Sequence, residues 1–180
     1  MRRGFFILSE AYMKKITFIT GGARSGKSSY AEERAASHAG TKLYIATAEA
    51  LDEEMRSRIE LHKRRRGDKW QTIEEPIDIA PSIRDPKGAS CVLLDCLTLW
   101  LTNVMLRNRD VKSESARLMD AIRACPAPVY IVSNEVGMGI VPADELSRAF
   151  RDEAGRLNQQ IAAISDEAYI VVAGLPLKLK

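Results

Sequence analysis

Short apolar runs rich in β-branched residues alternate along this chain with stretches whose apolar residues recur every three or four positions. The runs lie at 16–20, 43–46, 91–94, 129–132 and 169–173, and the helical stretches at 28–38, 52–66, 97–106 and 113–122. Strands buried on both faces read as continuous apolar runs because helices cover both sides of a parallel sheet. The alternation therefore predicts an α/β fold with a mostly parallel sheet.

The last third of the chain predicts one long helix and two additional strands. One face of that helix is formed by apolar side chains at steps of three, four or seven, namely Leu146, Phe150, Leu157, Ile161 and Ile164. Such a face packs against a sheet. A further strand is predicted at 70–73. Residues 177–179, which follow Gly174 and Pro176, are predicted to fold back as a short antiparallel edge strand.

The loop after the first predicted strand has the composition of a phosphate-binding loop. It fits the pattern G-x-x-x-x-G-K-[ST] between a strand and a helix, with the residues Gly21, Gly22, Ala23, Arg24, Ser25, Gly26, Lys27 and Ser28. Its glycines let the backbone turn its amide groups toward phosphates at the positive end of the new helix. We expect Lys27 to reach the outer phosphates and the Ser28 hydroxyl to bind Mg²⁺. The loop predicts binding of a purine nucleoside triphosphate.

An acidic residue at the end of a neighbouring strand would complete such a site. Asp95 follows the apolar residues 91–94 in the manner of a Walker B strand, and we expect it to hold Mg²⁺ directly or through water. The sequence therefore predicts a three-layer P-loop NTPase fold of the RecA-like type. Its central sheet is expected to be mostly parallel, with a short antiparallel edge at the C-terminal end.

Length and charge narrow the picture further. With 180 residues and 46% hydrophobic composition, the chain can bury one core, so we predict a single domain at 13–180. The net charge of +3 is too nearly balanced to predict a nucleic-acid or membrane partner. Cys91, Cys96 and Cys125 lack metal-ligand spacing and adjoin apolar stretches. We expect them in the core of a protein from a reducing, cytoplasmic compartment.

The first twelve residues are predicted to be an N-terminal extension. Arg2 and Arg3 precede the apolar run 5–8, which imitates a secretory signal but is too short for one. No stretch approaches the length of a membrane span, so none is predicted.

Several segments beyond the phosphate loop carry a more specific signal. In chain order they are YIATA at 44–48, DEEM at 52–55, RIELHK at 58–63, WQTIEEP at 70–76, NEVGMGIVP at 134–142 and FRDEAGRLN at 150–158. Together with the phosphate loop, they closely resemble the bifunctional adenosylcobinamide kinase and adenosylcobinamide-phosphate guanylyltransferase family of cobalamin biosynthesis. The resemblance runs from about residue 13 to residue 180.

This resemblance implies two consecutive reactions. The aminopropanol hydroxyl of adenosylcobinamide is phosphorylated by ATP or GTP, and GMP is then transferred from GTP to the new phosphate through a guanylylated histidine. The products are adenosylcobinamide-GDP and pyrophosphate. The resemblance thus implies GTP, ATP and Mg²⁺ as cofactors, adenosylcobinamide and its phosphate as substrates, and a homotrimer.

His62 matches the histidine that becomes guanylylated in the family. Neutral imidazole is a good nucleophile near pH 7, and a phosphoramidate intermediate divides one difficult transfer into two displacements. Taken alone, a helical histidine is also interpreted as a surface or packing residue. His62 lies three residues after Ile59 and seven after Met55, so we expect it near the edge of a buried face. His38, near a helix end, is expected to interact with the helix dipole.

Further GTP contacts are implied by the resemblance at Thr47, Ala48, Glu49, Lys63, Arg64, Arg65, Arg66, Glu74 and Asp95. Cations beside a nucleophilic histidine would neutralise charge at the α-phosphate, although residues 63–66 alone also fit a solvated surface. Glu74 either hydrogen-bonds the guanine edge or ends a strand. The family often has Glu where this chain has Asp95, and the shorter carboxylate is expected to reach Mg²⁺ through water. Residues 137–139 are interpreted as a cover for the corrinoid, a subunit contact or a turn.

Three other functions are alternatives to this one. A GTPase-type switch would need an Asn-Lys-x-Asp sequence, which the chain lacks. An ATP-dependent nucleic-acid motor would need a longer chain, a DNA-binding loop and a stronger basic excess. A chain that retains only one of the two activities, for example a single-activity P-loop kinase, remains compatible with the sequence.

Overall fold

The computed structural model describes residues 14–49, 53, 67 and 69–180. In this part of the chain, seven strands form one sheet in the order β3-β2-β4-β5-β1-β6-β7. The strands are β1 (Ile16–Gly21), β2 (Lys42–Ala46), β3 (Trp70–Glu74), β4 (Val92–Asp95), β5 (Val129–Asn134), β6 (Glu167–Val172) and β7 (Leu175–Lys178). All neighbouring pairs are parallel except β6 and β7, which form an antiparallel edge. The predicted sheet is confirmed.

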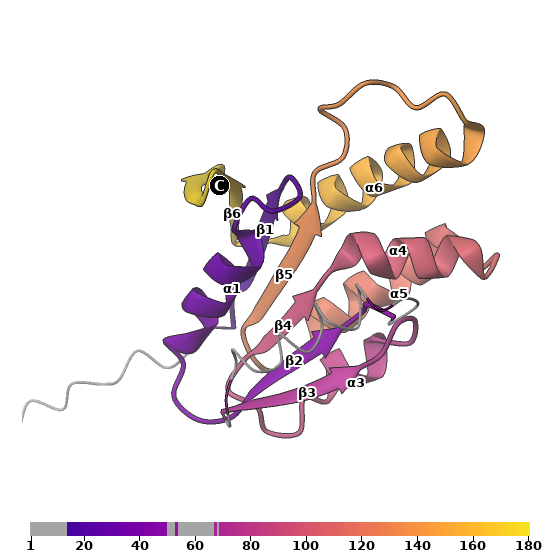
Figure 1. Cartoon of the computed structure of the whole chain (residues 1–180). Coiled ribbons are helices and arrows are strands. Elements are labelled where there is room, and N and C mark those ends of the chain that lie inside the picture. The colour runs from indigo at the N-terminus through magenta and orange to yellow at the C-terminus, as the bar shows by residue number, and fades with distance from the viewer. Residues whose placement is uncertain (1–13, 50–52, 54–66, 68) are drawn as a thin grey trace, which may run out of the picture.

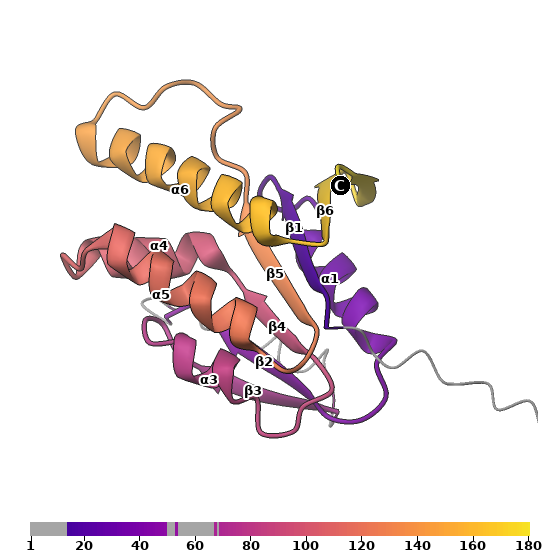
Figure 2. The same cartoon turned by 180° about the vertical axis from the view of Figure 1, so that it is seen from behind.

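Helices cover both faces of the sheet, which gives three layers. Helix α1 (Lys27–Ala36) lies on one face (Figure 1), and the other face carries α3 (Ala80–Arg84), α4 (Leu97–Leu106), α5 (Val111–Ala124) and α6 (Glu145–Ile164) (Figure 2). Side chains of neighbouring residues in one strand point to opposite faces of the sheet. Phe18 packs in the cluster beneath α4 to α6, whereas Ile19 packs with Ala31 and Ala35 of α1. The predicted three-layer fold is confirmed.

The cores of both layers contain residues of the predicted apolar stretches, including the helical stretch 97–106. Trp100 is buried, Met105 packs partly against the same cluster, and Cys91, Cys96 and Cys125 are buried free thiols. One member of the predicted apolar face of α6 differs, because Leu146 is 59% exposed. The cause is visible in Figure 1, where the N-terminal half of α6 extends beyond the end of the sheet.

Local chemistry explains the ends of the helices that differ from the prediction. Helix α5 begins two residues earlier than predicted, because the Asp110 side chain caps it by accepting a hydrogen bond from the Ser113 amide at 3.0 Å. Helix α3 was not predicted, since it has five residues and Pro81 in its first turn. The helix predicted at 52–66 lies outside the described residues apart from Glu53, which is helical.

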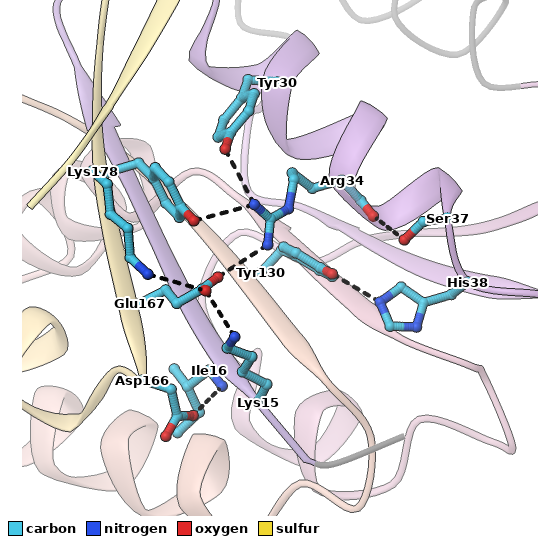
Figure 3. A network of polar contacts seen from close by, with 11 residues as sticks. Lys15, Ile16, Tyr30, Arg34, Ser37, His38, Tyr130, Asp166, Glu167 and Lys178 are labelled. Atoms are coloured by element: carbon cyan, nitrogen blue, oxygen red, sulfur yellow. Dashed lines mark hydrogen bonds and ion pairs between the residues drawn. The ribbon is translucent and has the colours of Figure 1, made fainter. Parts of the chain in front are cut away.

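His38 is buried rather than placed as a charge at the end of α1. Its Nε2 lies 2.8 Å from the Tyr130 hydroxyl (Figure 3), in the segment between α1 and β2. Burial lowers the pKa of His38, and the nearby charges of Lys42 and Arg34 lower it further. The lowered pKa favours the neutral ring near pH 7. The expected interaction of His38 with the helix dipole stays a prediction.

Glu167 of β6 ties α1 and the C-terminal edge of the sheet to the start of β1. Its carboxylate lies 2.7 Å from Lys15 Nζ, 3.0 Å from Arg34 and 3.5 Å from Lys178 Nζ (Figure 3). Burial opposes ionisation of this carboxyl, but the three cations outweigh burial and lower its pKa to about 2. The ionised form therefore stabilises the fold.

We expect Glu167→Gln to lower the free energy of unfolding by about 1–2 kcal/mol at pH 7, because the substitution removes the charge that pairs with three cations. The effect is limited because solvent partly screens Lys15 and Lys178. The pKa of Glu167 is lower in the folded protein than in the unfolded chain, where it is near 4.3. Its charge therefore stabilises the fold fully above about pH 4.3, and this stabilisation is lost as the pH falls toward the folded pKa. Urea unfolding should therefore show a difference between variant and wild type that shrinks from pH 7 toward pH 3. Glu153→Gln, which breaks an exposed pair with Arg156, is the control and should change stability by less than about 0.5 kcal/mol. A pH-independent difference would contradict this role of the Glu167 charge.

Candidate active site

The predicted site residues of the described chain come together at one edge of the sheet. The phosphate loop follows β1, and Asp95 ends β4. Strand β5 lies between these two strands, with Asn134 opposite Gly21 and Val132 opposite Asp95 in register. Ligands of parallel α/β sheets bind at the carboxyl ends of the strands, because helix N-termini and loops converge there. The topology thus brings the loop and the acidic residue to the same edge.

Two glycines of the phosphate loop occupy positions that disfavour any residue with a side chain. A Cβ on Gly21 would lie 2.4 Å from the Val171 carbonyl oxygen, closer than real Cβ atoms come. Gly26 has a φ of 93°, and its Cβ would lie 3.2 Å from the Gly174 Cα. Both glycines are therefore required by backbone conformation and by close approach of the β6–β7 hairpin.

Lys27 begins α1 and reaches back across the loop. The residue is only 8% exposed, and its Nζ donates a hydrogen bond to the Gly22 carbonyl at 3.1 Å. Ser28 is half-buried in the first turn of the helix, whereas Gly22, Ala23 and Arg24 are exposed. A buried ammonium group beside helix amides provides a site for anionic oxygens, as phosphates supply.

Buried hydroxyl groups around the loop provide further polar atoms. Thr20 Oγ1, Ser25 Oγ and Ser133 Oγ are buried without a hydrogen-bond partner among the described residues. Thr20 and Ser133 are opposite each other in the β1–β5 register. Buried hydroxyls normally have partners, so this edge contains hydrogen-bonding capacity that a ligand or water molecules would use.

Asp95 is half-buried and oriented by an aromatic residue of the neighbouring strand. The Tyr44 hydroxyl of β2 donates a 2.8 Å hydrogen bond to Asp95 Oδ2. Within the described residues, no group of three or more His, Cys, Asp or Glu side chains could hold a metal ion alone. Mg²⁺ typically uses one or two protein oxygens together with substrate phosphates and water. The hard oxygen donors of Ser28 and Asp95 fit that kind of binding.

Thr47 joins the ends of β2 and β4 through its side chain. The residue is 0% exposed, and its hydroxyl donates to the Cys96 carbonyl at 2.7 Å and accepts from the Cys96 amide at 2.8 Å. The Asn103 side chain of α4 donates to the Thr47 carbonyl at 2.9 Å. These bonds fix the two strand ends. The predicted contact of Thr47 with GTP stays a prediction.

The other implied GTP contacts around β2 and β3 have different surroundings. Glu49 binds Arg107 at the end of α4 through two hydrogen bonds of 2.7 and 3.0 Å, and Ala48 is half-buried beside it. Glu74 is exposed at the end of β3. Glu75 Oε1 accepts hydrogen bonds from the amides of Ile77 and Asp78, so Glu75 caps the following turn. The positions of Ala48 and Glu74 are compatible with ligand contacts, which stay predictions.

A hydrogen-bonded chain at the end of β5 was not assigned a role from the sequence. The Asn134 side chain donates to Thr98 Oγ1 at 2.8 Å, and the Asn158 side chain of α6 donates to the Asn134 carbonyl at 3.1 Å. Asn158 Oδ1 and one guanidinium nitrogen of Arg151 are buried without partners among the described residues. The segments 134–142 and 150–158 signalled these residues, but only the strand order places Asn134 between the phosphate loop and Asp95.

The residues predicted to handle the α-phosphate lie outside the described residues. They are His62, Lys63, Arg64, Arg65 and Arg66. The loop at 137–139 is present after β5 and exposed. Within the described part of the chain, no helix has both the length and the apolar character that crossing a membrane requires.

The sequence is similar to those of three bifunctional adenosylcobalamin biosynthesis proteins. It is 46% identical over 165 residues to the bifunctional adenosylcobalamin biosynthesis protein CobP of Pseudomonas aeruginosa, covering 90% of this chain and 95% of that one. It is 41% identical over 178 residues to the bifunctional adenosylcobalamin biosynthesis protein CobU of Escherichia coli, covering 90% and 98%. The CobU protein of Salmonella typhimurium is 40% identical over 185 residues, with the same coverage.

Among solved structures, the similarity is lower. A prototypical ATPase from the type III secretion system of pathogenic bacteria has a TM-score of 0.48 at 14% identity, over 91% of this chain and 56% of that one. The P4 protein of bacteriophage phi6 in complex with ADP has a TM-score of 0.46 at 16% identity, over 95% and 55%.

The family profile described as cobinamide kinase / cobinamide phosphate guanyltransferase matches residues 17–179. This match runs from the second residue of β1 to beyond the end of β7. It therefore includes both the phosphate loop and the hydrogen bonds at Asn134. Together with relatives that are 40–46% identical over nine tenths of the chain, it shows that this protein belongs to the cobinamide kinase / cobinamide phosphate guanyltransferase family of enzymes.

Proposed function

We propose that this enzyme phosphorylates adenosylcobinamide with ATP or GTP and then transfers GMP from GTP to the resulting phosphate. The observation that carries the proposal is the phosphate loop with its buried Lys27, in a chain that matches the family profile over residues 17–179. The names of the relatives, which are bifunctional adenosylcobalamin biosynthesis proteins, support the two-step reaction.

In the first step, the hydroxyl oxygen of adenosylcobinamide attacks the γ-phosphorus, and the bond to the β-phosphate oxygen breaks. The hydroxyl proton is released, and a nucleoside diphosphate leaves. Lys27 and the amides of the phosphate loop hold the outer phosphates in position for this displacement. Ser28 and Asp95 would hold Mg²⁺, which supplies charge neutralisation between the phosphates when bound. Tyr44 keeps the Asp95 carboxylate oriented.

In the second step, His62 acts as the nucleophile. A ring nitrogen attacks the α-phosphorus of GTP, pyrophosphate leaves, and the histidine is guanylylated. A phosphate oxygen of adenosylcobinamide phosphate then attacks the same phosphorus, and the histidine is released as adenosylcobinamide-GDP forms. Cations at 63–66 would stabilise the charge that develops on the α-phosphate oxygens.

The test is incubation of the purified protein with adenosylcobinamide, Mg²⁺, ATP and GTP. The corrinoids are then separated by chromatography and identified by mass spectrometry. We expect adenosylcobinamide phosphate first and adenosylcobinamide-GDP later, with equimolar pyrophosphate. Accumulation of the phosphate alone would indicate a single-activity kinase. GTP hydrolysis without any corrinoid product would instead favour a GTPase-type protein and reject the proposal.

We further propose that the enzyme is a homotrimer, as the family resemblance implies. Apolar side chains of the segment from β5 to α6 support an interface, because Met138 is 79%, Ile140 is 97% and Leu146 is 59% exposed. Large apolar side chains exposed in one segment are typical of contact surfaces. Light scattering coupled to gel filtration should give three times the chain mass of 20.0 kDa. The mass of a single chain would contradict this assembly.

A further inference from the structure

The β6–β7 hairpin contacts the phosphate loop directly. Strand β6 is paired with β1, so the turn that leaves β6 emerges beside the loop that leaves β1. The Gly174 amide donates a 2.8 Å hydrogen bond to the Ser25 carbonyl, and the Gly26 and Gly174 backbones are in close contact. A segment near the C-terminus thus packs against the loop near the N-terminus.

The hairpin turn presents this amide without using it in the sheet. Val172 pairs with Leu175, so the turn has two residues, Ala173 and Gly174, with φ values of 52° and 81°. Positive φ at both positions is typical of a type I′ turn, which matches the twist of the flanking strands. In such a turn the amide of the second residue takes no part in the strand pairing. It is therefore available to bind a group outside the hairpin.

Binding of the Ser25 carbonyl orients the next amide of the phosphate loop. A trans peptide is planar, with its C=O and N–H groups pointing in opposite directions. When the Ser25 carbonyl points at Gly174, the N–H of Gly26 in the same peptide points away from the hairpin. Gly26 adopts a φ of 93° and has no side chain that restricts its backbone. Its orientation therefore depends on hydrogen bonds and contacts with neighbouring residues.

We propose that Gly174 is a positioning residue for nucleotide binding, because its hydrogen bond to Ser25 aims the Gly26 amide at the β-phosphate of a bound nucleotide. The proposal rests on phosphate binding by the loop, which is part of the proposed function, but it does not depend on the corrinoid chemistry. It predicts a defect that is specific for nucleotides with a β-phosphate.

The experiment measures binding of GDP and GMP by calorimetry, since neither nucleotide can donate a GMP group with release of pyrophosphate. Gly174→Pro would remove the N–H, but proline cannot adopt the φ of 81° at this position. The decisive variant therefore replaces Gly174 by glycolic acid, and we expect it to bind GDP about tenfold more weakly, with GMP affinity unchanged. Gly174→Asn is the matched control, because asparagine keeps the N–H and tolerates a positive φ. It should bind GDP within about twofold of the wild type.

A variant with only the donor removed is needed because the proline ring is incompatible with the positive φ of Gly174. Replacing Gly174 by glycolic acid exchanges its N–H for an oxygen and leaves the flexible backbone in place, so the same selective loss of GDP affinity is expected. Unchanged GDP affinity would overturn the proposal, as would an equal loss for GDP and GMP. If the wild type binds GDP no more tightly than GMP, the phosphate loop assignment itself is wrong. If GDP binding behaves as expected but no corrinoid is converted, only the proposed reaction fails.

Discussion

His62→Ala is expected to reduce transfer of GMP to adenosylcobinamide phosphate by at least about 1,000-fold, because removal of a covalent nucleophile eliminates the intermediate. Phosphorylation of adenosylcobinamide should stay within about threefold of the wild type, since that step uses the phosphate loop. With GTP labelled at the α-phosphate, the wild type should form acid-labile protein-bound GMP on the peptide that contains His62. The variant should form none.

His38→Gln is the control for this experiment. His38 lies in the segment between α1 and β2, at the opposite end of the strands from the phosphate loop, and contacts Tyr130. The control should therefore keep the label, even if its melting temperature falls because a buried contact is lost. Equal loss of kinase activity in a folded His62→Ala protein would contradict the division of labour between His62 and the phosphate loop.

Lys27→Ala is expected to lower both activities by at least about 100-fold, because one loop holds the outer phosphates of the nucleotide in either step. The defect should also appear as weaker binding of ATP and GTP. Initial rates of both reactions and calorimetric binding measure it. Melting temperatures of variant and wild type should be comparable, since the substitution removes a buried charge rather than an apolar core contact.

Arg123→Ala provides the matched control for a lost cation. Arg123 is exposed in the last turn of α5 and pairs with Asp120 of the same helix. Both activities of this control should equal those of the wild type. Lys27→Ala that retains GMP transfer while losing phosphorylation would show that the two steps bind their nucleotides at different places.

Local signals explain how far the sequence could predict the fold. The continuous apolar runs predict strands because both faces of the sheet are buried, and the phosphate loop is recognised because glycine and lysine are required at fixed spacing. The exposure of the first turns of α6 could not be predicted in this way. Periodicity identifies the apolar face that includes Leu146, but it does not say where the sheet beneath the helix ends.

Contacts between distant segments explain what the sequence could not predict at the site. The resemblance implied a nucleotide contact at Thr47, but nothing local indicates that its hydroxyl is bonded to the Cys96 backbone. In the same way, Gly174 gives a turn signal in the sequence, and its hydrogen bond to Ser25 depends on β6 pairing with β1. Such roles arise from strand order, which the local pattern leaves open.

The position of β1 between β5 and β6 has a consequence for synthesis on the ribosome. β1 leaves the ribosome long before β5, which begins at Val129, and β6, which begins at Glu167. β1 therefore has neither neighbour until more than a hundred further residues have been made. We expect the nascent protein to acquire its nucleotide site only after β5 and β6 have left the ribosome, so that chaperones which shield apolar strands would act on it before any nucleotide can.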